Sequence, residues 1–185
     1  MNHSPDGARD KTPGTIKIIG IGQRLRGDDA AGLAAVRLWQ ERYQANIERT
    51  NLQVELAELP GIGLLNLLEG TSIAILVDAV HSNTKPGTIH VLSEEQLEAF
   101  SGGAGSAHGW GVAETLSLGH KLIPASMPEK LWLIGIEAGN LLLGESLSPV
   151  VESVLPEAAD LIEQLAAIGL STDQDPSTSS RISPR

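Results

Sequence analysis

Two adjacent carboxylates, Asp28 and Asp29, follow a glycine-containing turn near the start of the chain. The segment Gly20-Ile21-Gly22-Gln23-Arg24-Leu25-Arg26-Gly27-Asp28-Asp29 is typical of a strand that leads through a turn into a helix. In open parallel sheets, ligands bind at the carboxyl ends of the strands. Carboxylates at this position could bind a metal ion, transfer a proton or cap the helix. We therefore interpret the first loop as a candidate site.

A dinucleotide site is the main alternative for a glycine-rich first loop, and the spacing argues against it. The dinucleotide fingerprint requires G-x-G-x-x-G, whereas Gly20, Gly22 and Gly27 are spaced G-x-G-x-x-x-x-G. Two carboxylates at the start of the next helix would also repel the pyrophosphate that a helix N-terminus normally attracts. We therefore do not expect a nucleotide site here.

Asp78 and His108 could complete a metal site with the first loop. Asp78 lies near the end of the apolar run Ile73–Val80, where an ionised carboxylate is costly unless it is hydrogen-bonded, paired or bound to a metal. His108 lies in a Gly- and Ser-rich segment before a predicted helix, whose dipole favours a neutral, metal-ligating imidazole. Two carboxylates and one imidazole suit a divalent first-row metal and leave coordination positions open for substrate or water.

Each of these residues also has a structural interpretation. Asp28 or Asp29 could cap the helix that follows the first loop. Asp78 could cap the turn that contains His81, and His108 could stand at a helix start without binding a metal. We expect His81, the main rival imidazole, to be solvated in that polar turn. Spacing alone does not decide among these readings, because each residue is common in its context.

Four further acids and imidazoles remain at the sequence level. Glu137 ends another apolar run and could support the ligands, face the substrate or be a solvated loop acid. His120 falls late on a predicted helix, His90 lies within a strand and His3 lies in the N-terminal tail. None of these histidines is preferred to His108.

The elements that must position these residues alternate between strands and helices. Thr15–Ile21 and Ile73–Val80 are β-branched apolar runs, typical of central strands covered on both faces. Further strands are predicted at Leu52–Leu59, Thr88–Leu92 and Leu131–Ile136, and helices at Ala30–Tyr43, Val112–Leu122 and Val150–Ile168, with short helices after Gly61 and after a capping box at Ser93-Glu94-Glu95-Gln96. The pattern predicts an α/β three-layer sandwich, with a central, mostly parallel, twisted sheet of about five strands and helices on both faces.

Length and composition limit the classes of function. A chain of 185 residues suits one domain, which we expect at 15–170, between a flexible N-terminal tail at 1–14 and a disordered C-terminal tail at 171–185. The net charge of -10 disfavours binding to nucleic acid or to anionic membranes. Because the chain has no cysteine, catalysis must come from carboxylates, histidine or hydroxyls. With no apolar export segment or membrane span, we expect a cytoplasmic monomer.

Several of these motifs, taken in order, resemble those of the hydrogenase maturation proteases. They are Gly20-Ile21-Gly22, Arg26-Gly27-Asp28-Asp29 and Gly32, then Leu76-Val77-Asp78-Ala79, then Ser106-Ala107-His108, and then Gly135-Ile136-Glu137. The resemblance spans roughly residues 16 to 165. It rests on the order and spacing of several motifs together, and the fold it implies is a single α/β domain.

The resemblance implies an endopeptidase that removes a C-terminal extension from the nickel-loaded large-subunit precursor of a nickel-iron hydrogenase. By position, the metal-contacting and catalytic trio of that family falls on Asp29, Asp78 and His108. The nickel belongs to the precursor, so the enzyme holds no permanent metal. The chain departs from the family pattern in having Asp29 where Glu is frequent and Gln23 where Asn is common, which leaves the choice between Asp28 and Asp29 open.

Two other functions remain at this stage. The first is a metal-dependent hydrolase of small molecules, which would hold its own metal. The second is a non-catalytic chaperone that docks the precursor without cutting it. The sequence does not identify the hydrogenase that would be the client, or the group that would activate water.

Overall fold

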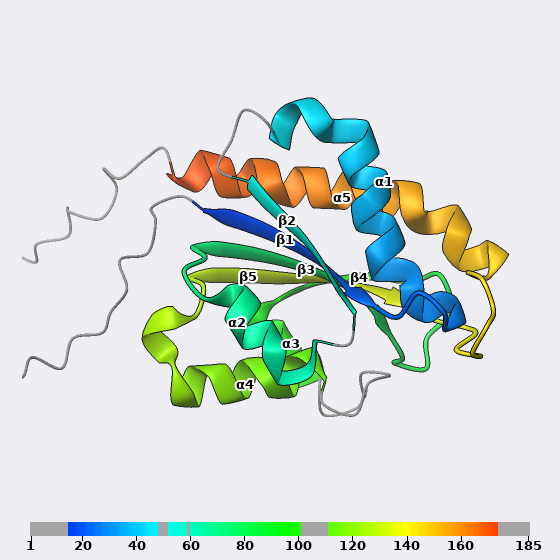
Figure 1. The fold of residues 1–185 in the computed structure, drawn as a ribbon, viewed down its shortest axis with the longest axis horizontal. Coiled ribbons are helices and arrows are strands. Elements are labelled where there is room, and N and C mark those ends of the chain that lie inside the picture. The colour runs from blue at the N-terminus through cyan, green and yellow to red at the C-terminus, as the bar shows by residue number, and fades with distance from the viewer. Residues whose placement is uncertain (1–14, 48–51, 59, 101–110, 174–185) are drawn as a thin grey trace, which may run out of the picture.

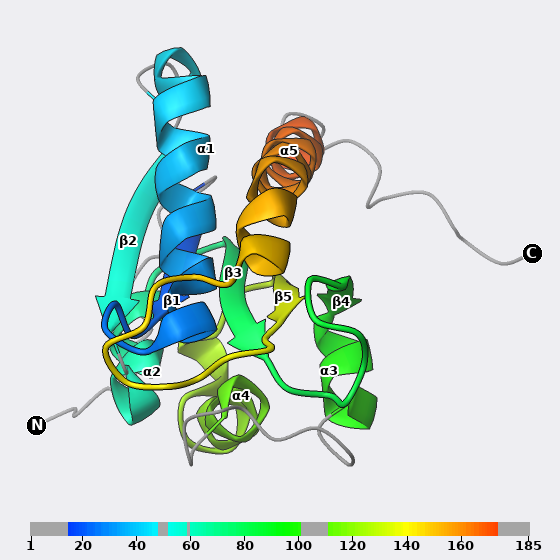
Figure 2. The same ribbon diagram turned by 90° about the vertical axis from the view of Figure 1, so that its right-hand side faces the viewer.

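The computed structural model describes residues 15–47, 52–58, 60–100 and 111–173, which form a sheet between two layers of helices (Figures 1 and 2). The sheet has five strands in the order β2-β1-β3-β5-β4. They are β1 (Ile16–Gly22), β2 (Leu52–Glu58), β3 (Ile73–Val80), β4 (Ile89–Ser93) and β5 (Lys130–Glu137). All neighbours pair in parallel except β4, which runs antiparallel to β5 at one edge. The predicted α/β sandwich is confirmed.

Burial follows the position of each strand in the sheet. All eight residues of the central strand β3 are buried, as expected for a β-branched run covered on both faces. The edge strand β2 exposes Gln53 and Glu55 while Leu52 is buried, which matches its alternating sequence. Because β1, β3 and β5 are parallel, their carboxyl ends lie in a row at one end of the sheet, and this row carries the first loop, Asp78 and Glu137. Below, this edge of the sheet means the row of carboxyl ends and not an outer strand.

Two hydrophobic clusters attach the helices to the two faces of the sheet. The helices α1 (Ala31–Ile47) and α5 (Pro149–Asp173) cover one face and contact alternate residues of β3 such as Ile75 and Val77. The helices α2 (Leu64–Leu68), α3 (Glu94–Phe100) and α4 (Val112–Leu122) cover the other face, which includes Leu76 and Val80. Three short 3-10 turns join these elements: η1 (Gly27–Ala30), η2 (Gly61–Gly63) and η3 (Pro124–Ser126).

The helix boundaries differ most from the sequence pattern at the ends of α1 and α5. The helix α1 continues to Ile47, four residues past the predicted end at Tyr43, where the backbone is kinked. The backbone N–H of Ser93 donates to Oε1 of Gln96 at 2.9 Å, which is one half of the predicted capping box. The helix α5 continues to Asp173, so residues 171–173, which we assigned to a disordered tail, are helical. Leu170 packs against the core and the hydroxyl of Ser171 donates to the carbonyl of Ala167, and both contacts extend the helix. The rest of both predicted tails lies outside the described residues.

In the part of the chain that the structure describes, no helix has the length and apolar character needed to cross a bilayer.

Candidate functional site

The first loop places Asp28 and Asp29 side by side at the carboxyl end of β1. Both residues lie in the turn η1 and both are fully buried. The N–H of Asp29 donates to the carbonyl of Arg26, and the carbonyl of Asp29 accepts from the N–H of Gln23. These bonds fold the loop into a tight turn, which places the two buried carboxylates at the start of α1.

A close contact between α1 and the sheet brings Asp29 near Asp78. A β-carbon on Gly32 would lie 2.2 Å from the carbonyl oxygen of Val77 and 2.4 Å from that of Ile21. Only glycine allows the first turn of α1 to approach the ends of β3 and β1 so closely. Since Asp29 precedes Gly32 by about one helical turn and Val77 precedes Asp78, the backbones of the two aspartates meet at the same edge.

Asp78 is buried within β3, with 2% of its surface exposed. Its Oδ1 accepts a hydrogen bond of 2.8 Å from the N–H of Ala79. Because side chains alternate along a strand, Asp78 shares the sheet face of Leu76 and Val80, the face covered by α2, α3 and α4. Burying a carboxylate is costly, so packing alone does not account for an aspartate at this position in a central strand.

Asp28 has a structural role that differs from the predicted helix cap. Its Oδ2 accepts from the N–H groups of Gly139 and Asn140, each at 2.8 Å, and from the hydroxyl of Ser148 at 2.9 Å. Its Oδ1 accepts from the N–H of Ser148 at 2.6 Å. Both oxygens are thus engaged with the loop between β5 and α5, so the cap interpretation of Asp28 is wrong, and Asp29 is left as the first-loop carboxylate that can serve as a ligand.

The hydrogen bonds to Asp28 also decide its charge. Burial by itself raises the pKa of this carboxyl, but the hydrogen bonds from Ser148, Asn140 and Gly139 favour the ionised form and bring the pKa below its usual value. Asp28 is therefore an anion at neutral pH. It anchors the later loop and does not serve as a proton donor.

His108 lies outside the described residues, so the proposed trio is described only in part. The chain is described again from Gly111, the N-cap of α4, three residues after His108. Figure 1 shows α4 beginning beneath the end of the sheet at which β1, β3 and β5 finish. Among the described residues, no group of three or more His, Asp or Glu side chains could hold a metal ion.

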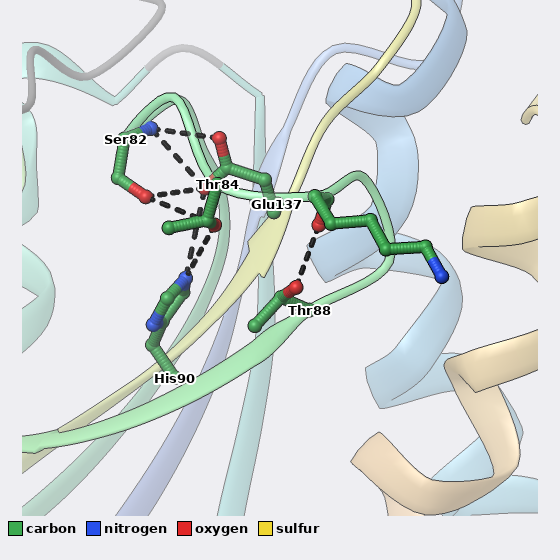
Figure 3. Close-up of polar contacts among 6 residues, drawn as sticks. Ser82, Thr84, Thr88, His90 and Glu137 are labelled. Atoms are coloured by element: carbon green, nitrogen blue, oxygen red, sulfur yellow. Dashed lines mark hydrogen bonds and ion pairs between the residues drawn. The ribbon is translucent and has the colours of Figure 1, made fainter.

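Glu137, the other acid at this edge, is not the loop residue that the sequence suggested. We considered a solvated loop acid, but Glu137 is the last residue of β5 and is fully buried. Its carboxylate accepts from the N–H of Ser82 at 2.9 and 3.1 Å and from the Ser82 hydroxyl at 2.7 Å (Figure 3). Burial raises the pKa of Glu137, but the bonds from Ser82 and Thr84 outweigh it and hold the pKa below its usual value. Glu137 therefore binds the turn after β3 as an anion.

The polar cluster around Glu137 does not have the geometry of a hydrolase triad. Nε2 of His90 lies 3.2 Å from the Thr84 hydroxyl and 3.6 Å from Oε2 of Glu137 (Figure 3). In a triad the acid and the nucleophile contact different ring nitrogens. Because one nitrogen faces both groups here, the imidazole cannot relay a proton between them. The sequence analysis missed Ser82 and Thr84, and their only signal was a polar turn after a buried strand.

The other described histidines lie away from this edge or in solvent. His81 is exposed, as expected. His120, near the end of α4, contacts the carboxylate of Glu94. A cavity of about 480 Å³ that includes Ser93, His120 and Trp132 lies at the opposite end of the sheet from Asp78, because Ser93 pairs with Trp132 near the start of β5. It therefore takes no part in the candidate site.

Comparisons with known proteins agree on one group of enzymes. A family model described as hydrogenase maturation protease (HycI) matches residues 37–165, a range that includes Asp78 and Glu137 and begins after the first loop. The hydrogenase 2 maturation protease of Escherichia coli strain K12 is 29% identical over 154 residues, which cover 83% of this chain and 90% of that protein.

Solved structures show the same likeness. The hydrogenase maturating endopeptidase HybD from E. coli superposes with a TM-score of 0.66 at 27% identity, covering 85% of this chain and 93% of that one. The [NiFe] hydrogenase maturation protease HybD from Thermococcus kodakarensis gives a TM-score of 0.64 at 29% identity, covering 82% of this chain and 99% of that one. The resemblance inferred from the motifs is confirmed.

Proposed function

The chain belongs to the hydrogenase maturation protease family, a family of endopeptidases, and on this premise we propose that it removes the C-terminal extension of a nickel-loaded hydrogenase precursor. The precursor is the large subunit of a nickel-iron hydrogenase, and the nickel is part of the substrate. The enzyme recognises this nickel through Asp29, Asp78 and His108. These three residues are also the ones to which we assign the catalytic role.

One observation supports this assignment above the others: the Gly32 contact brings the two buried aspartates to the same edge of the sheet. Asp28 is engaged elsewhere by four hydrogen bonds, which favours Asp29 as the ligand. Carboxylate oxygens and an imidazole nitrogen suit a divalent first-row metal. A buried carboxylate gains most from such a cation, because the low dielectric strengthens the attraction.

The geometry supports a mechanism based on positioning. When the three side chains contact the nickel of the precursor, the peptide segment beside that nickel is fixed over the sheet edge. Holding the scissile bond in place removes much of the entropic part of the barrier. The nickel can polarise a carbonyl or a water molecule, and the carboxylates can accept a proton from the attacking water.

We also propose the domain bounds, the location, the oligomeric state and the partner of the protein. Residues 15–173 act as a single peptidase domain, and the residues on either side of it take no part in the chemistry. The enzyme works as a cytoplasmic monomer whose partner is the precursor. It requires neither nucleic acid nor a membrane, in keeping with a net charge of -10.

The test is incubation of the purified protein with nickel-loaded and nickel-free large-subunit precursors, followed by mass spectrometry of the precursor. Loss of the C-terminal peptide from the nickel-loaded form alone supports the proposal. Precursor that binds the protein and keeps its full mass in both forms indicates a docking chaperone. Tight stoichiometric metal in the protein without precursor indicates a hydrolase with its own metal.

A further inference from the structure

Two loops at the proposed catalytic edge are fastened together by backbone hydrogen bonds. We call residues 23–28 and 139–148 the double loop. The N–H of Asp28 donates to the carbonyl of Asn140 at 2.7 Å, that of Gly144 to the carbonyl of Leu25 at 2.7 Å, and that of Gly27 to the carbonyl of Glu145 at 3.1 Å. Figure 2 shows the two segments side by side beneath α1 and α5. The Asp28 carboxylate adds side-chain hydrogen bonds between the same two segments.

The double loop buries a charge and exposes leucines, the reverse of the usual arrangement. Asp28 is fully buried, whereas Leu25, Leu142 and Leu143 are 70%, 65% and 77% exposed. The neighbouring Leu141 packs against the core cluster beneath α1 and α5, so one leucine of the loop points inward while the three exposed leucines point outward. The three exposed leucines are therefore not needed to hold the loop in place.

Exposing these three leucines forgoes free energy that burial would supply. Full burial of one leucine side chain contributes about 2 kcal/mol. Neighbouring exposed apolar side chains with polar residues around them are typical of protein interfaces. Arg24 and Glu58, which form an ion pair of 2.8 Å and are about half exposed, provide such a polar border beside Leu25. Because hydrogen bonds already fix the loops, they would lose little conformational entropy when a partner binds.

We propose that Leu25, Leu142 and Leu143 form a docking surface for an apolar area of the hydrogenase large-subunit precursor. This inference rests on the proposed function. Asp29 follows directly on Asp28, the anchor of the double loop, so these loops lie beside the point to which the precursor would bring its metal. The leucines provide affinity for the folded precursor, while the metal ligands provide the position of the scissile bond.

The test is the triple variant Leu25→Gln, Leu142→Gln, Leu143→Gln, with Leu122→Gln as the matched control. Leu122 is 63% exposed and lies at the end of α4, a helix on the opposite face of the sheet from α1 and α5. We expect the triple variant to raise KM for the nickel-loaded precursor by about tenfold or more, with kcat nearly unchanged. The control keeps the wild-type KM, and thermal unfolding is similar for all three proteins because the replaced side chains are exposed.

The outcomes separate this inference from the proposed function. An unchanged KM in the triple variant, with cleavage by the wild type intact, overturns the docking surface and leaves the function standing. If the wild type cleaves no nickel-loaded precursor, the proposed function fails, and binding of precursor measured by analytical ultracentrifugation then decides. Binding by the wild type that the triple variant loses supports the surface, and equal or absent binding overturns it. A wild-type dimer that the triple variant converts to a monomer also overturns it, because the surface then joins two copies of this chain.

Discussion

Replacing Asp28 by asparagine tests the anchoring role of this carboxylate. An asparagine can place its carbonyl oxygen where Oδ2 now accepts from Gly139, Asn140 and the Ser148 hydroxyl, and it keeps these three bonds in weaker, uncharged form. Its amide group then faces the N–H of Ser148, which donates to Oδ1 at 2.6 Å. That arrangement sets two donors against each other.

The magnitude follows from these four contacts. Leaving the partly buried Ser148 N–H without an acceptor costs about 1–3 kcal/mol, and the loss of charge assistance in the other three bonds adds about 1 kcal/mol each. Relief of the cost of burying an ionised carboxyl offsets part of this sum. We expect the free energy of unfolding to fall by about 3 kcal/mol, a loss that a domain with about 5–15 kcal/mol of stability can tolerate.

The assay is urea unfolding followed by far-UV circular dichroism, with Asp160→Asn as a control. Asp160 is exposed and pairs with Arg42 at 3.3 Å, so this control should lose less than about 1 kcal/mol. The pKa of Asp28 lies below its usual value in the folded state, so its contribution is present above the unfolded pKa, near 3.8, and is lost as the pH falls through the folded pKa. The gap between wild type and Asp28→Asn should therefore be full at neutral pH and should narrow below about pH 3.8. A gap of less than about 1 kcal/mol at neutral pH, or one that widens in acid, would refute the anchoring role.

Three further predictions concern the same edge of the sheet. Glu137→Gln should lower the free energy of unfolding by about 2 kcal/mol and increase amide hydrogen exchange at Ser82, because a neutral amide accepts its bonds less strongly; unchanged exchange at Ser82 would contradict this. Gly32→Ala should destabilise the protein by more than about 2 kcal/mol in the same unfolding assay, since its β-carbon would meet the Val77 carbonyl at 2.2 Å, and a neutral effect would show that α1 can shift. The double variant Asp78→Asn, His108→Ala should abolish processing of the nickel-loaded precursor in mass spectrometry while circular dichroism stays native, and full cleavage would remove both residues from the site.

The fold was predictable because its elements have strong periodicity. The run Ile73–Val80, apolar except for Asp78, is typical of a strand buried on both faces, and the predicted helix at Val112–Leu122 agrees with α4 to the residue. The end of α5 was less predictable. Ser171 and Thr172 have low helix preference, but tertiary contact through Leu170 extends the helix beyond Ile168.

The anchoring role of Asp28, as opposed to its neighbour Asp29, could not be predicted from the sequence. The two residues are adjacent and chemically identical, and what distinguishes them is a loop more than a hundred positions away: Asp28 pairs with Gly139 and Ser148, separated from it by 111 and 120 residues. Glu137 was misjudged for the same reason, since its partner Ser82 lies 55 residues earlier. Local patterns carry information on burial and periodicity, whereas such distant polar pairs depend on the finished topology.

A metal that arrives with the substrate places a demand on the site that a resident metal does not. A resident ion orders its own ligands, and its binding contributes to folding. If the nickel comes with the precursor, as we propose, the protein must hold Asp29 and Asp78 in place beforehand, or the cost of ordering them weakens precursor binding. The Asp28 bonds and the Gly32 contact provide that order without any ion. We therefore expect Asp28→Asn to cleave the loaded precursor more slowly than the wild type, and free nickel should not restore the lost activity, because the defect lies in the loops that hold the ligands.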